Sequence, residues 1–184
     1  MTEPRDGRRA RGERKRAAII AATLRVVERD GVAGVSHRAV AREAGVAGSA
    51  AIYYFATLDD LLVAALTAAA EDYARQLREI IEGGGDGVDG LAQLITEAGG
   101  SGRSRALAEQ ELTLLAARRP ALRAVATHWR DMVADVARGY TSDPVAVEAT
   151  VAAADGLCAR MLLGAESLTA AQVSALLRHA LRLT

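Results

Sequence analysis

The sequence predicts an all-α protein, and three observations support this. The chain of 184 residues is 51% hydrophobic but only 3% aromatic, and Ala, Leu, Val and Arg dominate it. As a set these residues favour helices, and the clusters of Val, Ile, Thr and Tyr that favour strands are scarce. Apolar residues recur at helical spacing, and capping residues, Pro and Gly mark the expected helix ends.

The N-terminal third predicts a charged arm followed by three helices. Residues 1–12 are polar and basic, and we expect them to form a flexible arm. From about residue 13, apolar side chains recur every three or four positions until Asp30 and Gly31, a combination that ends helices. Ser36 then has the position of an N-cap for a helix over 37–44. Gly45 leads a tight turn into a second short helix at 48–54.

The remaining residues predict one long helix and then several shorter ones. Thr57 and Asp60 have the spacing of a capping box at the start of a helix over 58–82. The segment GGGDGVDG at 83–90 favours a flexible connection. Pro144 stands at a position where proline is tolerated, the first turn of a helix. The later helices are expected at about 88–98, 103–118, 120–140, 144–164 and 170–183.

Charge is distributed unevenly, although the chain as a whole is neutral. Residues 1–54 contain eleven Lys and Arg against six Asp and Glu, whereas residues 55–184 contain twelve against seventeen. A small basic module favours binding to nucleic acid or to an anionic surface. No uninterrupted run of roughly 18 apolar residues is present, so we expect a soluble cytoplasmic protein without a membrane partner.

The sequence contains no pattern that predicts an enzyme, a metal site or a cofactor. It has no Ser/His/Asp order, no HExxH motif and no glycine-rich phosphate loop. The single cysteine, Cys158, has no second cysteine to pair with and no Cys/His ligand spacing around it. We therefore expect no enzymatic activity, no cofactor and no bound metal.

Two short helices joined by a glycine-led turn have the pattern of a helix-turn-helix unit. Val40, Val46 and Ile52 supply apolar contacts between the helices, and Ala41 is small enough for a close crossing. Gly45 supplies the left-handed backbone conformation that the turn requires. Such a unit places its second helix in the major groove of DNA, although two ordinary surface helices give a similar pattern.

The segment Val35–Leu62, VSHRAVAREAGVAGSAAIYYFATLDDLL, combines this unit with a pair of tyrosines and the start of the long helix. In this order the pieces resemble the N-terminal DNA-binding domain of the tetracycline-repressor (TetR) family. The resemblance extends back through the first helix, whereas the rest of the chain matches that family only in size, helical content and helix order. It implies a transcriptional regulator whose partner is double-stranded DNA.

The resemblance also implies roles for individual residues at the DNA. Arg38 stands where the tetracycline repressor reads a guanine, and a guanidinium suits the O6 and N7 atoms of that base, although a solvated surface charge is the alternative. Tyr53 and Tyr54 match an aromatic pair along the DNA backbone. Adjacent helical positions cannot all point inward, so we expect Phe55 in the core and at least one tyrosine outside. The remaining candidates for phosphate contacts are Arg14 from the basic run, Ser36, His37, Gly48 and Ser49.

A departure from the family pattern bears on specificity. Ile52 stands where many relatives have a further tyrosine. Ala47, Ala50 and Ala51 leave the recognition helix with few side chains that form hydrogen bonds. We therefore expect specificity to rest on Arg38, on contacts with thymine methyl groups and on DNA shape.

The resemblance implies a ligand cavity and a dimer interface in the C-terminal part. In the family, the middle helices surround a cavity, and the last two helices form a four-helix bundle with those of a second subunit. Trp129 is the best candidate for a cavity wall, because a large aromatic suits a planar apolar ligand. Only one of Glu109 and Glu111, two positions apart, can face inward. The cavity candidates are Tyr73, Glu109, Leu112, His128, Trp129, Met132, Asp155 and Met161, and the interface candidates are Val147, Val151, Cys158, Val173, Leu176, Leu177 and Leu181.

The sequence thus predicts an N-terminal three-helix helix-turn-helix domain followed by a helical ligand-binding and dimerisation domain. The expected bounds are 1–12 for the basic arm, 13–57 for the DNA-binding domain and 58–184 for the effector-binding and dimerisation domain. The leading hypothesis is a homodimeric repressor that binds a palindromic operator and is released by a small hydrophobic effector. A regulator of the same fold without an effector is the close alternative, and an interior filled by side chains would favour it. A helical scaffold or a membrane-surface protein is the other alternative.

Overall fold

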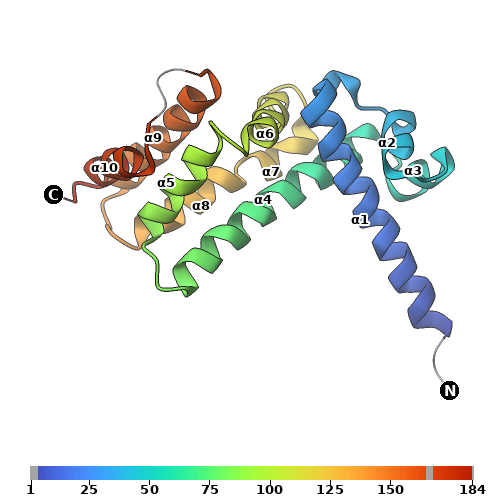
Figure 1. The fold of residues 1–184 in the computed structure, drawn as a ribbon, viewed down its shortest axis with the longest axis horizontal. Coiled ribbons are helices and arrows are strands. Elements are labelled where there is room, and N and C mark those ends of the chain that lie inside the picture. Colours follow the sequence, from blue (N-terminus) through green and yellow to red (C-terminus); the bar gives the residue numbers. More distant parts are fainter. Residues whose placement is uncertain (1–3, 165–167, 184) are drawn as a thin grey trace.

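The computed structural model describes residues 4–164 and 168–183, and these residues form α-helices without any strand (Figure 1). The prediction of an all-α protein is therefore confirmed. Two 3₁₀ turns, Val32–Gly34 and Pro120–Leu122, join some of the helices. The helices are α1 (Pro4–Asp30), α2 (His37–Ala44), α3 (Gly48–Tyr54), α4 (Leu58–Glu82), α5 (Gly87–Glu97), α6 (Arg103–Leu115), α7 (Arg123–Ala126), α8 (His128–Arg138), α9 (Pro144–Leu162) and α10 (Ala170–Ala180).

The N-terminal module consists of α1, α2 and α3, packed against the start of α4. The hydroxyl of Ser36 accepts a hydrogen bond from the backbone N–H of Ala39 and caps α2, as predicted. Gly45 follows with a φ of 66°, a left-handed conformation that favours glycine and turns the chain toward α3. Thr57 and Asp60 form the predicted capping box at the start of α4. Local chemistry therefore determines each of these helix ends.

Two hydrophobic cores lie along α4. The N-terminal core, which includes the fully buried Ile19 and Leu61, joins α1, α2, α4 and α6. The C-terminal core joins α5, α8, α9 and α10 to the later part of α4 and includes Leu77, Leu91 and Val133. Burial of a large aliphatic side chain contributes roughly 1.5–3 kcal/mol, so each core holds its helices together as a unit.

A polar cluster holds the connection between α4 and α5, so the prediction of a flexible segment is wrong for its second half. The side chain of Asp86 accepts hydrogen bonds from the backbone N–H groups of Val88 and Asp89 and caps α5. Tyr140 donates a 2.8 Å hydrogen bond to Asp86, and Arg178 forms a 2.8 Å ion pair with it. Burial alone would raise the pKa of Asp86, but the bonds from Tyr140, Asp89 and Arg178 lower it below its ordinary value.

The first helix begins at Pro4, so the prediction of a flexible arm over 1–12 is wrong for the residues that the structure describes. Proline is tolerated in the first turn of a helix, and the Arg, Ala, Glu and Lys of the following sequence are good helix formers. Arg9 and Glu13 add an exposed ion pair of 3.1 Å at i, i+4 spacing. The basic N-terminal residues therefore extend α1 well beyond the rest of the module (Figure 1).

The helix expected over 120–140 is interrupted. The turn Pro120–Leu122 leads into α7, and Thr127 separates α7 from α8. The hydroxyl of Thr127 donates a 2.9 Å hydrogen bond to Asp131 in the first turn of α8. β-Branched residues such as Thr127 are also somewhat unfavourable in a helix interior. The interruption places Trp129 in the first turn of α8.

No single helix in the described part of the chain is long and apolar enough to cross a membrane. Only α3 and α4 taken together reach that length and hydropathy, and they meet at 76°. Ala51, Leu61 and Leu66 on these two helices are buried inside the protein.

Candidate nucleic-acid interface and ligand cavity

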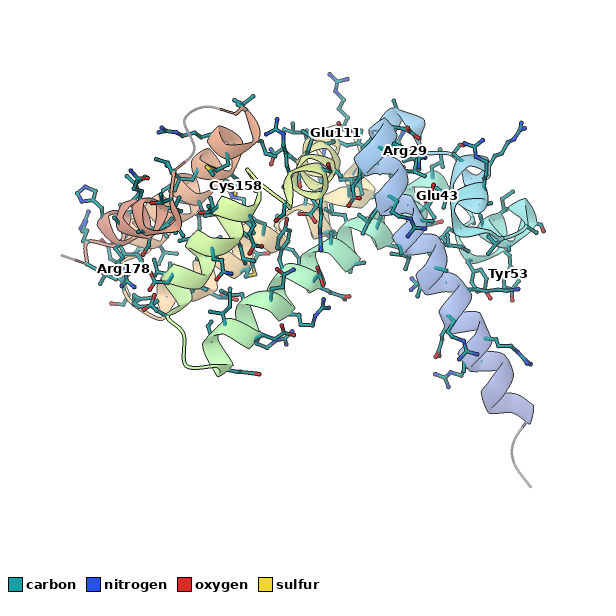
Figure 2. The ribbon with its side chains drawn as sticks, viewed as in Figure 1. Arg29, Glu43, Tyr53, Glu111, Cys158 and Arg178 are labelled. Carbon is teal, nitrogen blue, oxygen red and sulfur yellow. The ribbon has the colours of Figure 1, made fainter. Side chains whose placement is uncertain are left out.

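The outward face of α2 and α3 brings together several residues that the sequence predicts at the DNA. Ala51 is fully buried and Phe55 almost so, which directs the opposite side of α3 to solvent. Tyr53 is 82% exposed at the end of this helix (Figure 2). The exposed candidates are Ser36, Arg38, Gly48, Ser49 and Tyr53.

The two tyrosines of α3 have different environments. Tyr53 and Tyr54 pack edge to face, with ring centroids 5.1 Å apart and 85° between the ring planes. Tyr54 is half-buried, and its hydroxyl lies beside Gly12 of α1. Phe55 is buried in the N-terminal core, as predicted, with the Arg16 guanidinium 5.2 Å from its ring centroid. The prediction that at least one tyrosine leaves the interior is confirmed, and that tyrosine is Tyr53.

His37 forms a contact inside the protein. Its Nε2 atom lies 2.7 Å from the backbone oxygen of Phe55, so the Nε2–H group donates to that oxygen and joins the start of α2 to the end of α3. The ring is half-buried as a result. The Nε2–H group of His37 is therefore engaged inside the protein and is not available to a DNA phosphate.

Ion pairs fasten α2 to α1. Glu43 Oε1 lies 2.8 Å from Arg25 Nε, and Glu43 Oε2 lies 2.8 Å from Arg29 Nη1 (Figure 2). The hydrogen bonds from Arg25 and then Arg29 hold the pKa of the Glu43 carboxyl below its ordinary value. Exposed pairs of this kind contribute little to stability because solvent screens them, so their main effect is to orient the two helices.

The N-terminal half of α1 adds a basic surface beside α3. The contact between Gly12 and the hydroxyl of Tyr54 places this half of α1 next to the end of α3. Basic side chains on a helix can neutralise backbone phosphates of a duplex that α3 enters. The exposed basic residues of this segment are Arg9, Arg11, Arg14, Lys15 and Arg16.

A cavity of about 700 Å³ lies between the two cores. Leu66 of the N-terminal core and Leu77 of the C-terminal core are both part of its wall. Tyr73 of α4 and Trp129 of α8 meet there edge to face, with ring centroids 6.0 Å apart. The guanidinium of Arg105 lies 5.0 Å from the centroid of the Tyr73 ring. A space of this size, with aromatic rings in its wall, suits a small organic molecule.

Carboxylates outnumber basic side chains in the wall of the cavity, which also contains Arg130. Glu109 forms a 3.0 Å ion pair with Arg105, and Asp155 pairs with Arg130 at 3.3 Å. Burial raises the pKa of Glu109 and the pKa of Asp155 above their ordinary values, although these arginines oppose the shift. Burial and the neighbouring Glu109 also raise the pKa of Tyr73, so its phenol stays protonated. The carboxylates of the wall are Glu109, Asp131, Asp135 and Asp155.

Comparison with known proteins identifies the family to which a chain with these two sites belongs. Residues 19–65 match the family described as bacterial regulatory proteins of the tetR family, and residues 82–183 match the tetracyclin repressor-like C-terminal domain. The chain belongs to the TetR family. Members of this family are transcriptional regulators, so the resemblance predicted from Val35–Leu62 is confirmed.

Solved structures of TetR-type proteins cover nearly the whole chain. A TetR-family member from Streptomyces coelicolor A3 is 40% identical, with a TM-score of 0.78, over 90% of this chain and 97% of that one. The multidrug binding protein EbrR complexed with ethidium is 40% identical over the same shares, with a TM-score of 0.76. EbrR has also been solved with malachite green and with proflavin. The HTH-type transcriptional regulator PksA of Bacillus subtilis is 37% identical over 68 residues, which are 37% of this chain and 33% of that regulator.

Most of the residues predicted to line the cavity of this TetR-family chain do lie in its wall. Leu112 does not, because it is fully buried in the N-terminal core, and its neighbour Thr113 reaches the cavity instead. Met161 packs in the C-terminal core against Gly99. The predictions for Leu112 and Met161 are therefore wrong. The candidates found in the wall are Tyr73, Glu109, His128, Trp129, Met132 and Asp155.

Cys158 lies in the cavity wall rather than on the outer surface of α9, so its prediction as an interface residue is wrong. Burial raises the pKa of its thiol to about 12, so the sulfur is a neutral, weakly polar part of the wall. Gln110 and Thr113 of α6 add polar groups that were not predicted. No pattern in the polar sequence of α6 distinguishes these side chains from exposed ones.

Most of the other predicted interface residues belong to the interior of the single chain. Leu176 alone among the predicted set is exposed, at 46%. Five of the predicted side chains on α9 and α10 instead face the C-terminal core, so these interface predictions are wrong. The buried residues are Val147, Val151, Val173, Leu177 and Leu181.

Two contacts join the helices around the cavity to the DNA-binding module. Glu111 of α6 accepts a 2.8 Å hydrogen bond from the backbone N–H of Val32, in the turn between α1 and α2 (Figure 2). Arg119 forms a 2.5 Å ion pair with Asp59 in the first turn of α4. Glu109 faces the cavity, so the prediction that only one of the two α6 carboxylates points there is confirmed.

Proposed function

We propose that this TetR-family chain is a homodimeric transcriptional repressor that binds a palindromic operator in the cytoplasm and is released by a small organic cation. The observation that carries the proposal is the course of α4. Leu61 and Leu62 at its start are part of the N-terminal core, whereas Tyr73 and Ala74, just over three turns later, line the cavity. A ligand that displaces α4 therefore acts directly on the helices that carry the DNA-binding residues.

The outward face of α2 and α3 supports operator binding. Arg38 is exposed beside the start of α3, where a guanidinium can bind the O6 and N7 atoms of a guanine. Tyr53, with Arg14 and Lys15 of α1 on the neighbouring surface, supplies groups for backbone phosphates. One module of this size makes few contacts with DNA, so two modules on a palindromic site account best for specific binding.

The outward face of α9 and α10 supports the homodimer. Val145 is 64% exposed at the start of α9, and Leu176 is exposed on α10. Ala149, Ala152 and Gly156 are also exposed on α9, and these small residues allow another helix to approach closely. Exposed apolar residues gathered on two neighbouring helices are typical of an interface. The same two helices were expected to dimerise from the resemblance, but through the face that is buried here.

The chemistry of the cavity wall supports a cationic effector rather than a merely hydrophobic one. The wall contains four carboxylates and one arginine, Arg130, among the described residues. Glu109 pairs with Arg105, Asp155 with Arg130 and Asp135 with Arg138, and Asp131 adds a further negative charge. The face of Trp129 offers a site for an aromatic or cationic group. The EbrR complexes support this choice, because ethidium, malachite green and proflavin are all aromatic cations.

A regulator that works without an effector is less well supported. That alternative requires an interior filled by side chains, whereas a cavity of about 700 Å³ lies between the two cores. A ligand in this space can change DNA affinity only if it binds the DNA-competent and DNA-incompetent shapes with unequal affinity. The contacts of Glu111 with Val32 and of Arg119 with Asp59 provide paths for such coupling.

The test combines DNA selection with release by a cation. The full chain is used to select sites from random duplex DNA at low salt, and the mass of the complex on the recovered site is measured. Tetraphenylphosphonium, a lipophilic aromatic cation that does not intercalate, is then titrated into the complex, with neutral triphenylphosphine oxide as the control.

We expect a palindromic site, two chains bound to it, and release by the cation but not by the neutral compound. Failure to select any site would contradict the DNA-binding function. A complex that binds the cation in the cavity yet keeps its full operator affinity would contradict the effector part alone.

A further inference from the structure

The recognition helix carries a large apolar side chain on its solvent face. Ile52 is 55% exposed, and it lies three positions after Ser49 and directly before Tyr53, both of which are also exposed. The sequence suggested that Ile52 packs between the two helices of the motif, but more than half of it is uncovered. Because α3 is expected to enter DNA, a contact with DNA is the first explanation to consider for the exposure of Ile52.

The alanines of α3 do not provide the thymine contacts expected of this helix. Ala51 is fully buried, and Ala50 is half-buried beside it. Ala47 is exposed, but it precedes the helix and carries only one methyl group. Ile52 is therefore the large aliphatic side chain that α3 leaves exposed.

The surroundings of Ile52 favour DNA over a protein partner. Ile52 lines a shallow hollow between α2 and α3 together with Arg38, Arg42 and Val46. The side chains of Arg38 and Arg42 are both exposed at this hollow. A protein surface that covered Ile52 would have to remove two guanidinium groups from water, whereas DNA offers phosphates and guanine acceptors to them.

We infer that Ile52 reads the 5-methyl group of a thymine in the major groove, on a base pair near the one that Arg38 contacts. This inference rests on the proposed operator binding and names a base that α3 recognises. Thymine is the base that displays a methyl group in the major groove, so an aliphatic side chain there discriminates it from cytosine. The hydrogen bonds come from Arg38 of α2, and the apolar contact comes from α3.

The test removes the methyl group from the DNA and the side chain from the protein, separately and together. Each pair of symmetry-related thymines in the selected operator is replaced by deoxyuridine, which lacks the 5-methyl group but keeps the base-pairing atoms. Dissociation constants are measured for the wild-type chain and for Ile52→Ala. Ile81→Ala is the matched control, because Ile81 is 45% exposed at the far end of α4.

For the wild type, we expect one symmetric pair of uracils to weaken binding about 16-fold, or about fourfold for each buried methyl group. Ile52→Ala should bind the thymine and uracil operators equally. Ile81→Ala should show the same loss of affinity on uracil replacement as the wild type, which we call the uracil penalty. Ile52 is more than half exposed, so the variant is expected to fold, and circular dichroism checks this.

Two results would overturn the inference while leaving the proposed function intact. One is a selected operator in which no uracil pair weakens binding of the wild type. The other is an Ile52→Ala variant that keeps the wild-type uracil penalty. Failure of the wild type to select any operator is a different result, because it contradicts operator binding itself.

Discussion

Replacement of Glu109 by Gln is expected to weaken the binding of an aromatic cation about 5- to 30-fold. Two unit charges about 4 Å apart interact by about 4 kcal/mol at an effective dielectric constant of about 20. Arg105, which lies 3.0 Å from Glu109, already compensates part of that charge. We therefore assign about 1–2 kcal/mol to the attraction between Glu109 and the ligand, which corresponds to about 5- to 30-fold in Kd.

Glu109 and Asp155 should make the affinity for a cationic ligand decrease as the pH is lowered. Burial raises the pKa of Glu109 and of Asp155 above their ordinary values, while ethidium keeps its positive charge throughout this range. As the pH falls through these raised pKa values, the carboxylates become neutral and the affinity for ethidium falls. At higher pH both carboxylates are ionised and the affinity is constant. In the Glu109→Gln variant, only the pH dependence that arises from Asp155 should remain.

The measurement is a titration of ethidium fluorescence with the protein in the absence of DNA, between about pH 5 and 8. Glu79→Gln is the matched control, because Glu79 is a 67% exposed carboxylate on α4 that pairs with Arg75 outside the cavity. An unchanged Kd for Glu109→Gln would refute the electrostatic reasoning. So would an affinity of the wild type that increases as the pH is lowered.

Three further changes test the DNA interface, the coupling between the cavity and the DNA-binding module, and the stability of the fold. Arg38→Ala should weaken binding to the selected operator by about 1–3 kcal/mol and leave non-specific binding nearly unchanged in gel-shift titrations; a uniform loss on all sequences would make Arg38 a phosphate contact instead. Glu111→Ala removes the acceptor for the Val32 N–H, so the cation should reduce operator affinity about 5- to 15-fold less than in the wild type. Glu111→Gln keeps an acceptor oxygen and should retain most of the reduction that the cation causes in the wild type. Tyr140→Phe loses the bonds to Asp86 and Gly87 and should destabilise the chain by about 1–2 kcal/mol, or about 2–8 °C in Tm, while Tyr53→Phe, at an exposed position, should melt like the wild type.

The features predicted correctly from the sequence depend on residues close together in the chain. Ser36 caps α2 through the N–H of Ala39, three residues away, and Thr57 caps α4 through Asp60 at the same spacing. Gly45 ends α2 because its φ is positive, a conformation that glycine adopts more readily than other residues. Chemistry of this short range can be recognised without knowledge of tertiary contacts, and it locates the helix-turn-helix motif.

The features that were not predicted depend on the packing of distant segments. Helix α9 is apolar on several sides, so periodicity cannot show which side meets the core, the cavity or a second subunit. In the structure Val151 faces the core, Cys158 faces the cavity and Val145 faces solvent. The hydrogen bond from His37 to Phe55 likewise depends on how α2 and α3 cross. Only the folded arrangement distinguishes these roles.

The proposed action of a ligand on DNA binding rests on the positions of the two cores. Leu66 belongs to the N-terminal core and Leu77 to the C-terminal core, and the cavity lies between them along α4. Packed cores resist deformation, so an occupant of the cavity changes the angle between the two cores more easily than the shape of either. Leu112 and the bond from Val32 to Glu111 tie α6 to the N-terminal core, and Phe55 ties the end of the recognition helix to the same core. If α9 and α10 join two chains, their C-terminal cores are fixed to each other, and we infer that rotation of each N-terminal core changes the spacing of the two recognition helices.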